Sequence, residues 1–240
     1  MIVITAEDHF EIIYQRAHGM LAAKIAEQIK HSFRPPANLW LETLVAIADH
    51  DDGRRNWEGD FHLNEKGYPK DFTEFNFDEE QATRVVATAE CKSRWVSMLV
   101  SKHLVELYGD IPEARALIKD QYALQSKIQK HLPFDEEASQ CYYRVLKWAD
   151  ELSLRICKQE IPAKGDKEFL EMLPDGSKSF LTHLEDISVA PWIFEKDKVV
   201  FEIEKRKIEK RVYESDKDLQ DTLNKAEISI SSYKFIKEDA

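Results

Sequence analysis

An apolar run that ends in a histidine and an aspartate is the feature that decides the fold and the function expected of this chain. Residues 39–51 read LWLETLVAIADHD, and the last two are His50 and Asp51. Neighbouring residues on a helix point about 100° apart, because one turn holds about 3.6 residues. An imidazole beside a carboxylate builds a poor core, but the two suit one metal centre if other helices supply further ligands.

Three further polar residues lie on the apolar faces of segments that are expected to be helical, and they are His18, His103 and Asp150. Each follows the three- and four-residue spacing of its apolar neighbours, which places it on the inward stripe. A single inward histidine is more often a hydrogen-bonded core residue, and a single aspartate is more often a cap or half of an ion pair. An inward carboxylate is costly unless it is paired or binds a metal, so the joint pattern on four helices favours a shared metal site.

The order of these residues resembles that of the HD-domain superfamily of metal-dependent phosphohydrolases, in which His18, His50-Asp51 and Asp150 match the pattern His, His-Asp, Asp. The chain is most similar to an uncharacterised bacterial family with a His-Asp-Asp-Gly motif, which begins here at His50. The resemblance implies that these four residues bind one divalent metal ion. It also implies that His103 is the extra histidine of members that hold two ions.

The chemistry that follows is hydrolysis by a metal-activated water. Histidine and carboxylate ligands suit iron, manganese, zinc or nickel, in one or two ions. A bound metal lowers the pKa of water toward neutrality and so provides a nucleophile. Asp52 is the candidate general base, and Arg54 or Arg55 is the candidate cation for a phosphoryl group. The expected substrate is a small phosphate ester or nucleotide.

Two other classes of function stay open for the same residues. A di-iron oxygenase on a similar scaffold would activate dioxygen, and iron with a visible absorption band would distinguish it from a hydrolase. A non-catalytic ligand-binding or sensor module would keep the helical core but lose the chemistry. A metal-free protein with a filled cavity would favour that module.

Composition limits the partners and the compartment. A net charge of −11 over 240 residues argues against a nucleic-acid polymer as partner, because phosphate contacts need a basic face. Three cysteines without a Cys-x-x-Cys spacing indicate a reducing compartment. No basic-then-apolar leader and no apolar run of about 20 residues is present, so we expect a cytoplasmic protein with no membrane partner. A homodimer remains open.

The fold class expected from these patterns is mainly α, an HD-domain-like helical bundle with a small C-terminal antiparallel β-sheet (α+β). Residues 1–162 are expected to form a helical metal-binding core, with helices over 6–31, 78–108, 111–131 and 135–158 and a further one from Asn38 to the His-Asp pair. Residues 163–240 are expected to form a β-rich extension packed on that core. The aromatic segment 52–77 suits either a lid or a loop anchored at the edge of the core.

Overall fold

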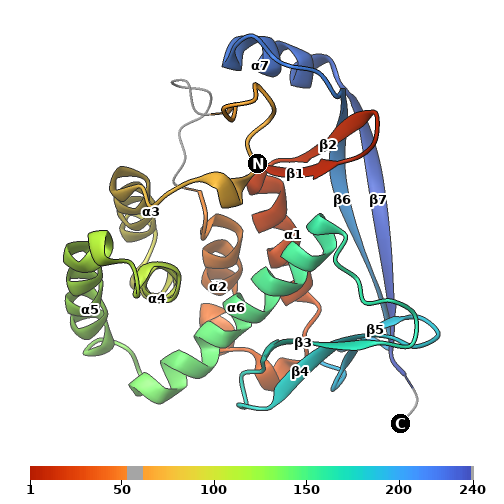
Figure 1. Ribbon diagram of the computed structural model, residues 1–240. Helices are drawn as coiled ribbons and strands as arrows, with labels where there is room; N and C mark the ends of the chain where they lie inside the picture. Colours follow the sequence, from red (N-terminus) through yellow and green to blue (C-terminus); the bar gives the residue numbers. More distant parts are fainter. Residues whose placement is uncertain (53–61, 239–240) are drawn as a thin grey trace.

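A large sheet and a group of helices make up the computed structural model, which describes residues 1–52 and 62–238 (Figure 1). Seven strands form one sheet in this part of the chain: β1 (Ile2–Thr5), β2 (His9–Ile13), β3 (Lys167–Met172), β4 (Lys178–His183), β5 (Ile187–Ala190), β6 (Lys198–Glu209) and β7 (Glu227–Ile236). The same residues form the α-helices α1 (Gln15–Glu27), α2 (Ala37–Asp49), α3 (Glu79–Glu90), α4 (Arg94–Tyr108), α5 (Arg115–Gln129), α6 (Glu136–Lys158) and α7 (Asp216–Lys225). No helix in the described ranges is long and apolar enough to cross a membrane.

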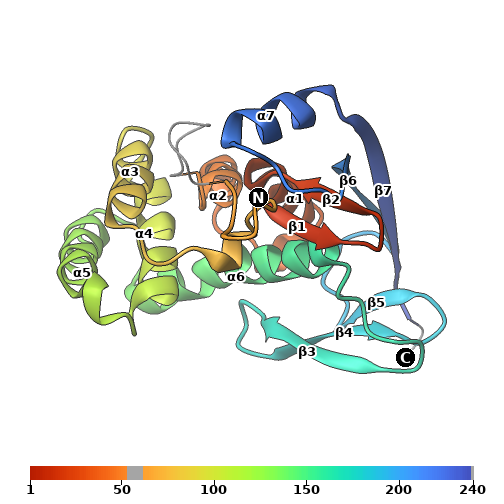
Figure 2. The ribbon, with the colours of Figure 1, turned by 45° about the horizontal axis from the view of Figure 1, so that its top comes forward.

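The sheet joins the two ends of the chain. Its strand order is β1-β2-β6-β7-β5-β4-β3, so the N-terminal hairpin pairs with the long strand β6. Neighbouring strands are antiparallel except β5 and β7, which are parallel. The sheet curls, with β1–β2 and β3–β4 lying toward its two ends, and α1 and α6 lie between it and the other helices of the core (Figure 2).

The prediction of a mainly α bundle with a small C-terminal sheet is therefore wrong. The sheet has seven strands, is mixed, and takes two of its strands from the first 13 residues. The predicted all-helical core is also wrong, because the helix expected from Ala6 begins only at Gln15. The HD-domain-like bundle is thus not the architecture of this chain. The boundary placed at residue 162 stays a prediction.

The N-terminal hairpin forms because its residues alternate between buried and partly exposed positions. Phe10 and Ile12 are buried, while His9 and Glu11 between them are only half-buried. Phe10 pairs with Ile208 of β6, so the alternation matches a strand with a partner almost 200 residues away. Thr5 and Asp8, which suit a helix cap, instead belong to the hairpin and its turn.

The segment expected as one helix over 78–108 is two helices. Cys91 ends α3, and Ser93 begins α4 by accepting a hydrogen bond from the backbone N–H of Val96 at 3.2 Å. A serine cap of this kind satisfies one of the free N–H groups of a helix start, so the chain can change direction there. The helices expected over 111–131 and 135–158 are found as α5 and α6.

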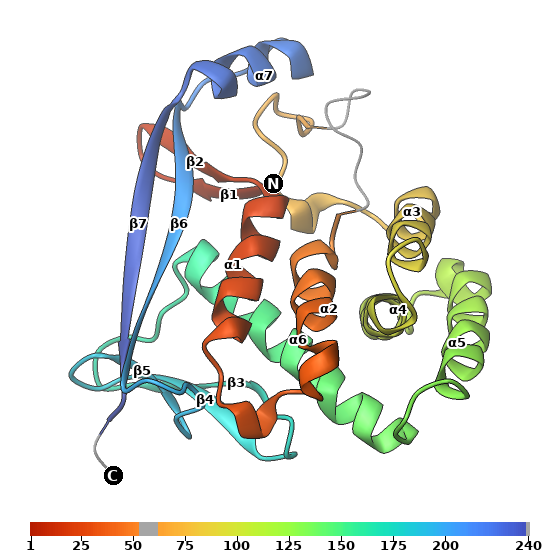
Figure 3. The same cartoon turned by 180° about the vertical axis from the view of Figure 1, so that it is seen from behind.

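Four helices surround the candidate site. α1 packs against α2 and α6, and α2 packs against α4 (Figure 3). One buried cluster connects these helices to the sheet and includes Trp95 and Trp148. A smaller cluster lies under α7 and includes Leu219 and Ile208. The main cluster thus fixes the four helices relative to one another.

Gly19 allows the closest of these approaches. A Cβ atom built at Gly19 would lie 2.4 Å from the backbone oxygen of Ala48 on α2. Real Cβ contacts of this length do not occur, so only glycine lets the two helix backbones come this near. Gly19 directly follows His18, and Ala48 stands two residues before His50. The contact therefore brings together two helices that carry candidate ligands.

Candidate metal centre

The five predicted metal ligands lie together at the junction of these four helices. His18 is in the first half of α1, His50 and Asp51 directly follow α2, His103 is in α4, and Asp150 is in α6. The three histidines are buried, with exposed fractions of 0%, 1% and 3% in chain order. We call these five residues the ligand cluster. Their meeting depends on pairs of helices that are far apart in the sequence.

Asp150 lies at the centre of the ligand cluster. Its Oδ1 atom is 2.9 Å from Nε2 of His18 and 3.1 Å from Nε2 of His50. Its Oδ2 atom is 4.0 Å from Nε2 of His103. Asp51 joins from the other side, with Oδ2 at 3.5 Å from Nε2 of His50. One carboxylate thus faces three imidazole rings.

The facing atoms lie within hydrogen-bond distance of one another, but their orientation is poor for hydrogen bonds. Nε2 of His18, Nε2 of His50 and Oδ1 of Asp150 are buried and have no hydrogen-bond partner. Buried polar atoms without partners are rare in proteins, and each needs an explanation. Lone pairs that converge on one point from three helices are the arrangement expected of metal ligands. Two overlapping groups have ligand atoms within 4.8 Å of one another: His18, His50 and Asp51, and His50, His103 and Asp150.

Hydrogen bonds on the far side of two rings set their tautomers. The hydroxyl of Ser153 donates to the backbone oxygen of Asp150 at 2.8 Å, so its oxygen accepts from Nδ1–H of His18 at 2.7 Å. Nδ1–H of His50 donates to the backbone oxygen of Ile47 at 2.6 Å, because a carbonyl can only accept. Each neutral ring then has its Nε2 lone pair free for a metal, which is the usual support of a metal-bound histidine.

Replacing Ser153 with alanine should weaken metal binding about 10- to 100-fold, the usual cost of losing a partner that orients a ligand. The change also leaves Nδ1–H of His18 buried without an acceptor, which costs about 1–3 kcal/mol of unfolding free energy. Calorimetric titration with zinc and urea unfolding measure the two effects. Ser139→Ala is the matched control, because Ser139 is a buried serine of the same helix that bonds to Gln129 instead. Equal metal affinities of the two variants would contradict the role of Ser153.

His103 completes the ligand cluster from α4. Its ring lies against that of His50, with centroids 4.8 Å apart, and its Nδ1 atom is 3.3 Å from the hydroxyl of Tyr143. Burial, and then the charge on His50, lower the pKa of His103 to about 4. The ring is therefore neutral near pH 7 and has a lone pair to offer.

Without a metal, a proton on His50 compensates the carboxylates. Burial acts to lower the pKa of His50, but the charges of Asp51 and Asp150 outweigh it and raise the pKa to about 10. Burial acts to raise the pKa of Asp150, yet the charge of His50 and contacts with His18 hold it well below its usual range. The cluster thus retains one positive charge near pH 7 at the place where a cation would bind.

A pocket of about 160 Å³ opens onto the ligand cluster. Asp51, His103 and Asp150 reach it, and its other walls carry aromatic rings, leucines and the amides of Gln15, Asn76 and Gln81. Nε2 of Gln15 donates to Oδ2 of Asp51 at 2.7 Å. This volume corresponds to about five water molecules of liquid, so the pocket admits a small polar group and not a polymer.

The described part of the predicted loop 52–77 forms one wall of this pocket through Phe72 and Phe75. It is anchored to the first strand, because the backbone N–H of Phe72 donates to the backbone oxygen of Met1 at 2.8 Å. The carboxylate of Asp71 accepts from the backbone N–H of Val3, also at 2.8 Å. The aromatic segment is thus fixed at the edge of the core and also contributes to the site.

Of the residues expected to assist catalysis, the structure describes Asp52 alone. Asp52 is half-buried and paired with Arg16, and it is not among the residues that reach the pocket. Arg54 and Arg55 lie outside the described residues. Their roles remain predictions.

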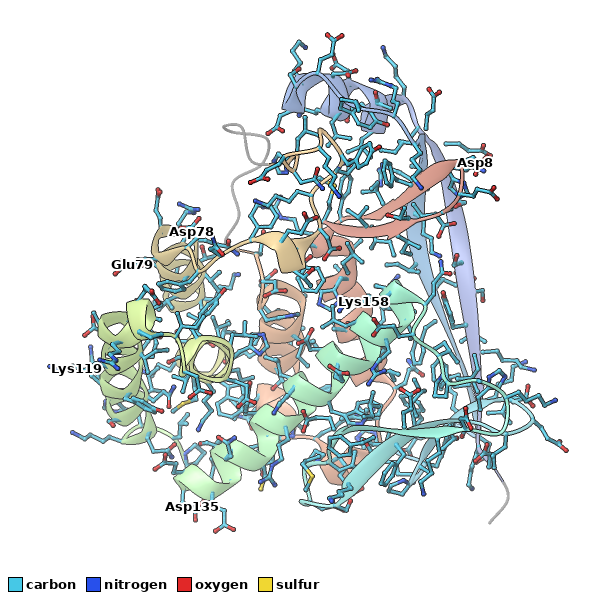
Figure 4. The ribbon with its side chains drawn as sticks, in the orientation of Figure 1. Asp8, Asp78, Glu79, Lys119, Asp135 and Lys158 are labelled. Atoms are coloured by element: carbon cyan, nitrogen blue, oxygen red, sulfur yellow. The ribbon has the colours of Figure 1, made fainter. Side chains whose placement is uncertain are left out.

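Sequence reasoning missed two cations that lie beside the pocket walls. Lys158 is 5.1 Å from the ring of Phe72, and Lys70 is 4.4 Å from the ring of Phe75. Lys158 stands at the C-terminal end of α6 (Figure 4), eight residues after Asp150, which is just over two turns along the helix and about 80° around it. This spacing is visible in the sequence and was a usable signal.

Comparison with known proteins places the chain in one family. A family model described as Protein of unknown function (DUF3891) matches residues 1–210, so the chain belongs to that family. The match covers every residue of the ligand cluster and ends just after β6. No curated protein and no solved structure matches the chain. The family match does not connect the chain to the HD-domain superfamily, which stays a resemblance in the order of residues.

Proposed function

We propose that the protein is a metal-dependent hydrolase of a small phosphate ester. The observation that carries the proposal is the set of buried atoms without hydrogen-bond partners on His18, His50 and Asp150, beneath a pocket that Asp150 also reaches. A structural core would orient these atoms for good hydrogen bonds to one another or to backbone groups. Their convergence beside a pocket supports a site that holds a cation and admits a small molecule.

The donor set fits a divalent transition metal. Neutral imidazoles and carboxylates suit iron, manganese, zinc and nickel. His18, His50, Asp51 and Asp150 would hold one ion, and His103 would contribute to a second. A bound divalent metal would activate water for attack on a phosphoryl group. Gln15 holds the Asp51 carboxylate in place by its hydrogen bond, and Ser153 does the same for the His18 ring.

Two observations support a small anionic substrate. The pocket volume of about 160 Å³ is below the usual 300–1,000 Å³ of ligand sites, so only part of a larger ligand would enter it. Lys158 and Lys70 lie against the rings of Phe72 and Phe75, and although neither lysine lines the pocket, their positive charges favour an anion nearby. We further propose a cytoplasmic location, because the three cysteines are all unpaired in the structure.

Turnover with defined metals tests the proposal. Protein purified without a His tag would be analysed for metal and then assayed with manganese, iron, zinc or nickel on phosphate mono- and diesters. Release of inorganic phosphate or alcohol that depends on metal is the expected result. Iron with a visible absorption band and no phosphoester turnover would favour the oxygenase. A protein that binds no metal at all would favour the sensor module.

Replacing Lys158 with methionine should raise the KM for a phosphate ester about tenfold and leave metal affinity unchanged. Methionine keeps the apolar length of the side chain but removes its charge, and a lost charge contact costs roughly 1.4 kcal/mol. Steady-state kinetics on the same ester measures the effect. Lys164→Met is the control, because Lys164 is exposed in the loop after α6. An unchanged KM would show that Lys158 does not bind the anion.

Metal-free protein should lose stability as the pH rises above 6.5. The pKa of His50 is about 10 in the folded state against about 6.5 for an ordinary histidine, so the unfolded chain releases this proton first. Stability therefore falls with rising pH between these values, by about 2 kcal/mol from roughly pH 6.5 to 8.5. His103, with a pKa of about 4, is already neutral in the folded state, and its half-protonated unfolded form loses its proton over this range, which opposes the fall by only about 0.4 kcal/mol.

Urea unfolding at the two pH values measures this loss. Metal-loaded protein is the control, because His50 then binds the ion without its proton and the loss should disappear. A metal-free protein whose unfolding free energy stays constant over this range would contradict a protonated His50.

A further inference from the structure

A second groove, of about 330 Å³, lies between α4, α5 and the start of α6. It shares no lining residue with the pocket at the ligand cluster. Its volume is within the range usual for small-molecule sites and is about twice that of the pocket beside the metal centre. The proposed hydrolase function does not use it.

A nearly buried amino group lies in this groove. Lys102 is 8% exposed, and its Nζ atom donates to Oε1 of Gln140 at 3.0 Å. Among the residues that the structure describes, no carboxylate oxygen forms an ion pair with this Nζ atom; its hydrogen-bond partner is a neutral amide, and Glu136 acts on its charge only from a greater distance. A buried charge is costly without a counter-charge. The groove gives an anion direct access to Lys102.

The rest of the lining suits an anion that carries an apolar part. Lys130 adds a second, exposed ammonium group to the groove, and Glu136 adds a single carboxylate, which leaves one net positive charge. Tyr122 is 55% exposed on one wall, although large aromatic residues usually bury more of their surface. Met98 lies below, with an exposed fraction of 1%. Ligand sites commonly combine apolar walls with a few charged groups.

We propose that this groove binds a small organic anion, with a carboxylate or phosphate group at Lys102 and Lys130 and an apolar part against Tyr122. Lys102 supplies a donor that is held by Gln140 before the ligand arrives. Lys130, which directly follows α5, is exposed and supplies the second ammonium group. The site is separate from the ligand cluster, so it serves a ligand other than the group that enters the metal centre.

Calorimetric titration with two probes tests this site. Inorganic phosphate supplies the anion alone, and benzoate supplies a carboxylate with a ring. Both are expected to bind the full chain saturably, and Lys102→Met and Lys130→Met are each expected to weaken both at least tenfold. Lys127→Met is the matched control, because Lys127 is an exposed lysine of α5 outside the groove. Tyr122→Ala is expected to weaken benzoate and leave phosphate unchanged.

Three outcomes would overturn the proposal. The first is that neither probe binds saturably. The second is that Lys102→Met and Lys130→Met bind as tightly as Lys127→Met. The third is loss of binding when the metal is removed by chelation, since this would place the anion at the metal centre. Lys130 is exposed, so its variant keeps the fold and the test stands even if Lys102→Met is unstable.

Discussion

Asparagine in place of Asp150 is expected to raise the dissociation constant for metal more than about 100-fold, the largest loss from any single change in the ligand cluster. The Oδ1 atom of Asp150 lies 2.9 Å from Nε2 of His18 and 3.1 Å from Nε2 of His50. Asparagine keeps the size of the side chain but removes the negative charge. It also presents an NH₂ group toward lone pairs that would bind the ion. Calorimetric titration with zinc or manganese, and metal analysis of the purified variant, measure the loss.

Glu151→Gln is the matched control for this change. Glu151 is the next residue of α6, and its carboxylate pairs with Arg155 away from the cluster. The control also turns an acid into an amide on the same helix, so it should leave metal affinity almost unchanged. Wild-type metal affinity in Asp150→Asn, with the variant folded, would show that Asp150 is not a ligand.

Alanine in place of Gly19 is expected to lower stability by about 1–3 kcal/mol and to weaken metal binding at the same time. The added Cβ would stand 2.4 Å from the backbone oxygen of Ala48, and backbone cannot rotate away as a flexible side chain can. α1 and α2 must therefore separate, which moves His18 away from His50. Urea unfolding and zinc titration of the same preparation measure both effects.

Alanine usually favours a helix over glycine by about 1 kcal/mol, so an effect of this sign cannot come from helix propensity. Met20→Ala is the control, because Met20 is the next residue of α1 and is 52% exposed. That variant should differ little from wild type in both measurements. A Gly19→Ala variant that is more stable than wild type would mean that the helices adjust without separating.

The candidate site follows from local sequence better than the fold does. Each member of the ligand cluster lies in or beside a helix with a clear apolar stripe, and this periodicity is a local signal. The structure brings all five together, although metal binding itself stays a prediction. Ser153 stands three residues after Asp150 on the same stripe, so its support of His18 was also within reach of such reasoning.

The sheet shows where local signals fail. β2 has only five residues, and its partner β6 lies almost 200 residues further along the chain. No sequence pattern near Phe10 predicts that it pairs with Ile208. The pattern around Thr5 and Asp8 suited a helix cap, and long-range pairing overrides such local preferences. Ser93, which caps α4, was a local signal for the break between α3 and α4. The apolar pattern continues across this break, and it therefore suggested one long helix.

Pairing between the first and last parts of the chain has a consequence for the order of assembly. α1 directly follows β2, and β2 is held by β6, so the strand that anchors the start of α1 is made late in synthesis. Contacts between distant residues form slowly, because a long loop must close first. A ribosome-bound chain that ends before β6 would carry all five metal ligands without the strand that anchors α1. Metal capture is thus expected to follow the synthesis of β6 and its pairing with β2, so the protein would acquire its metal ion late in folding.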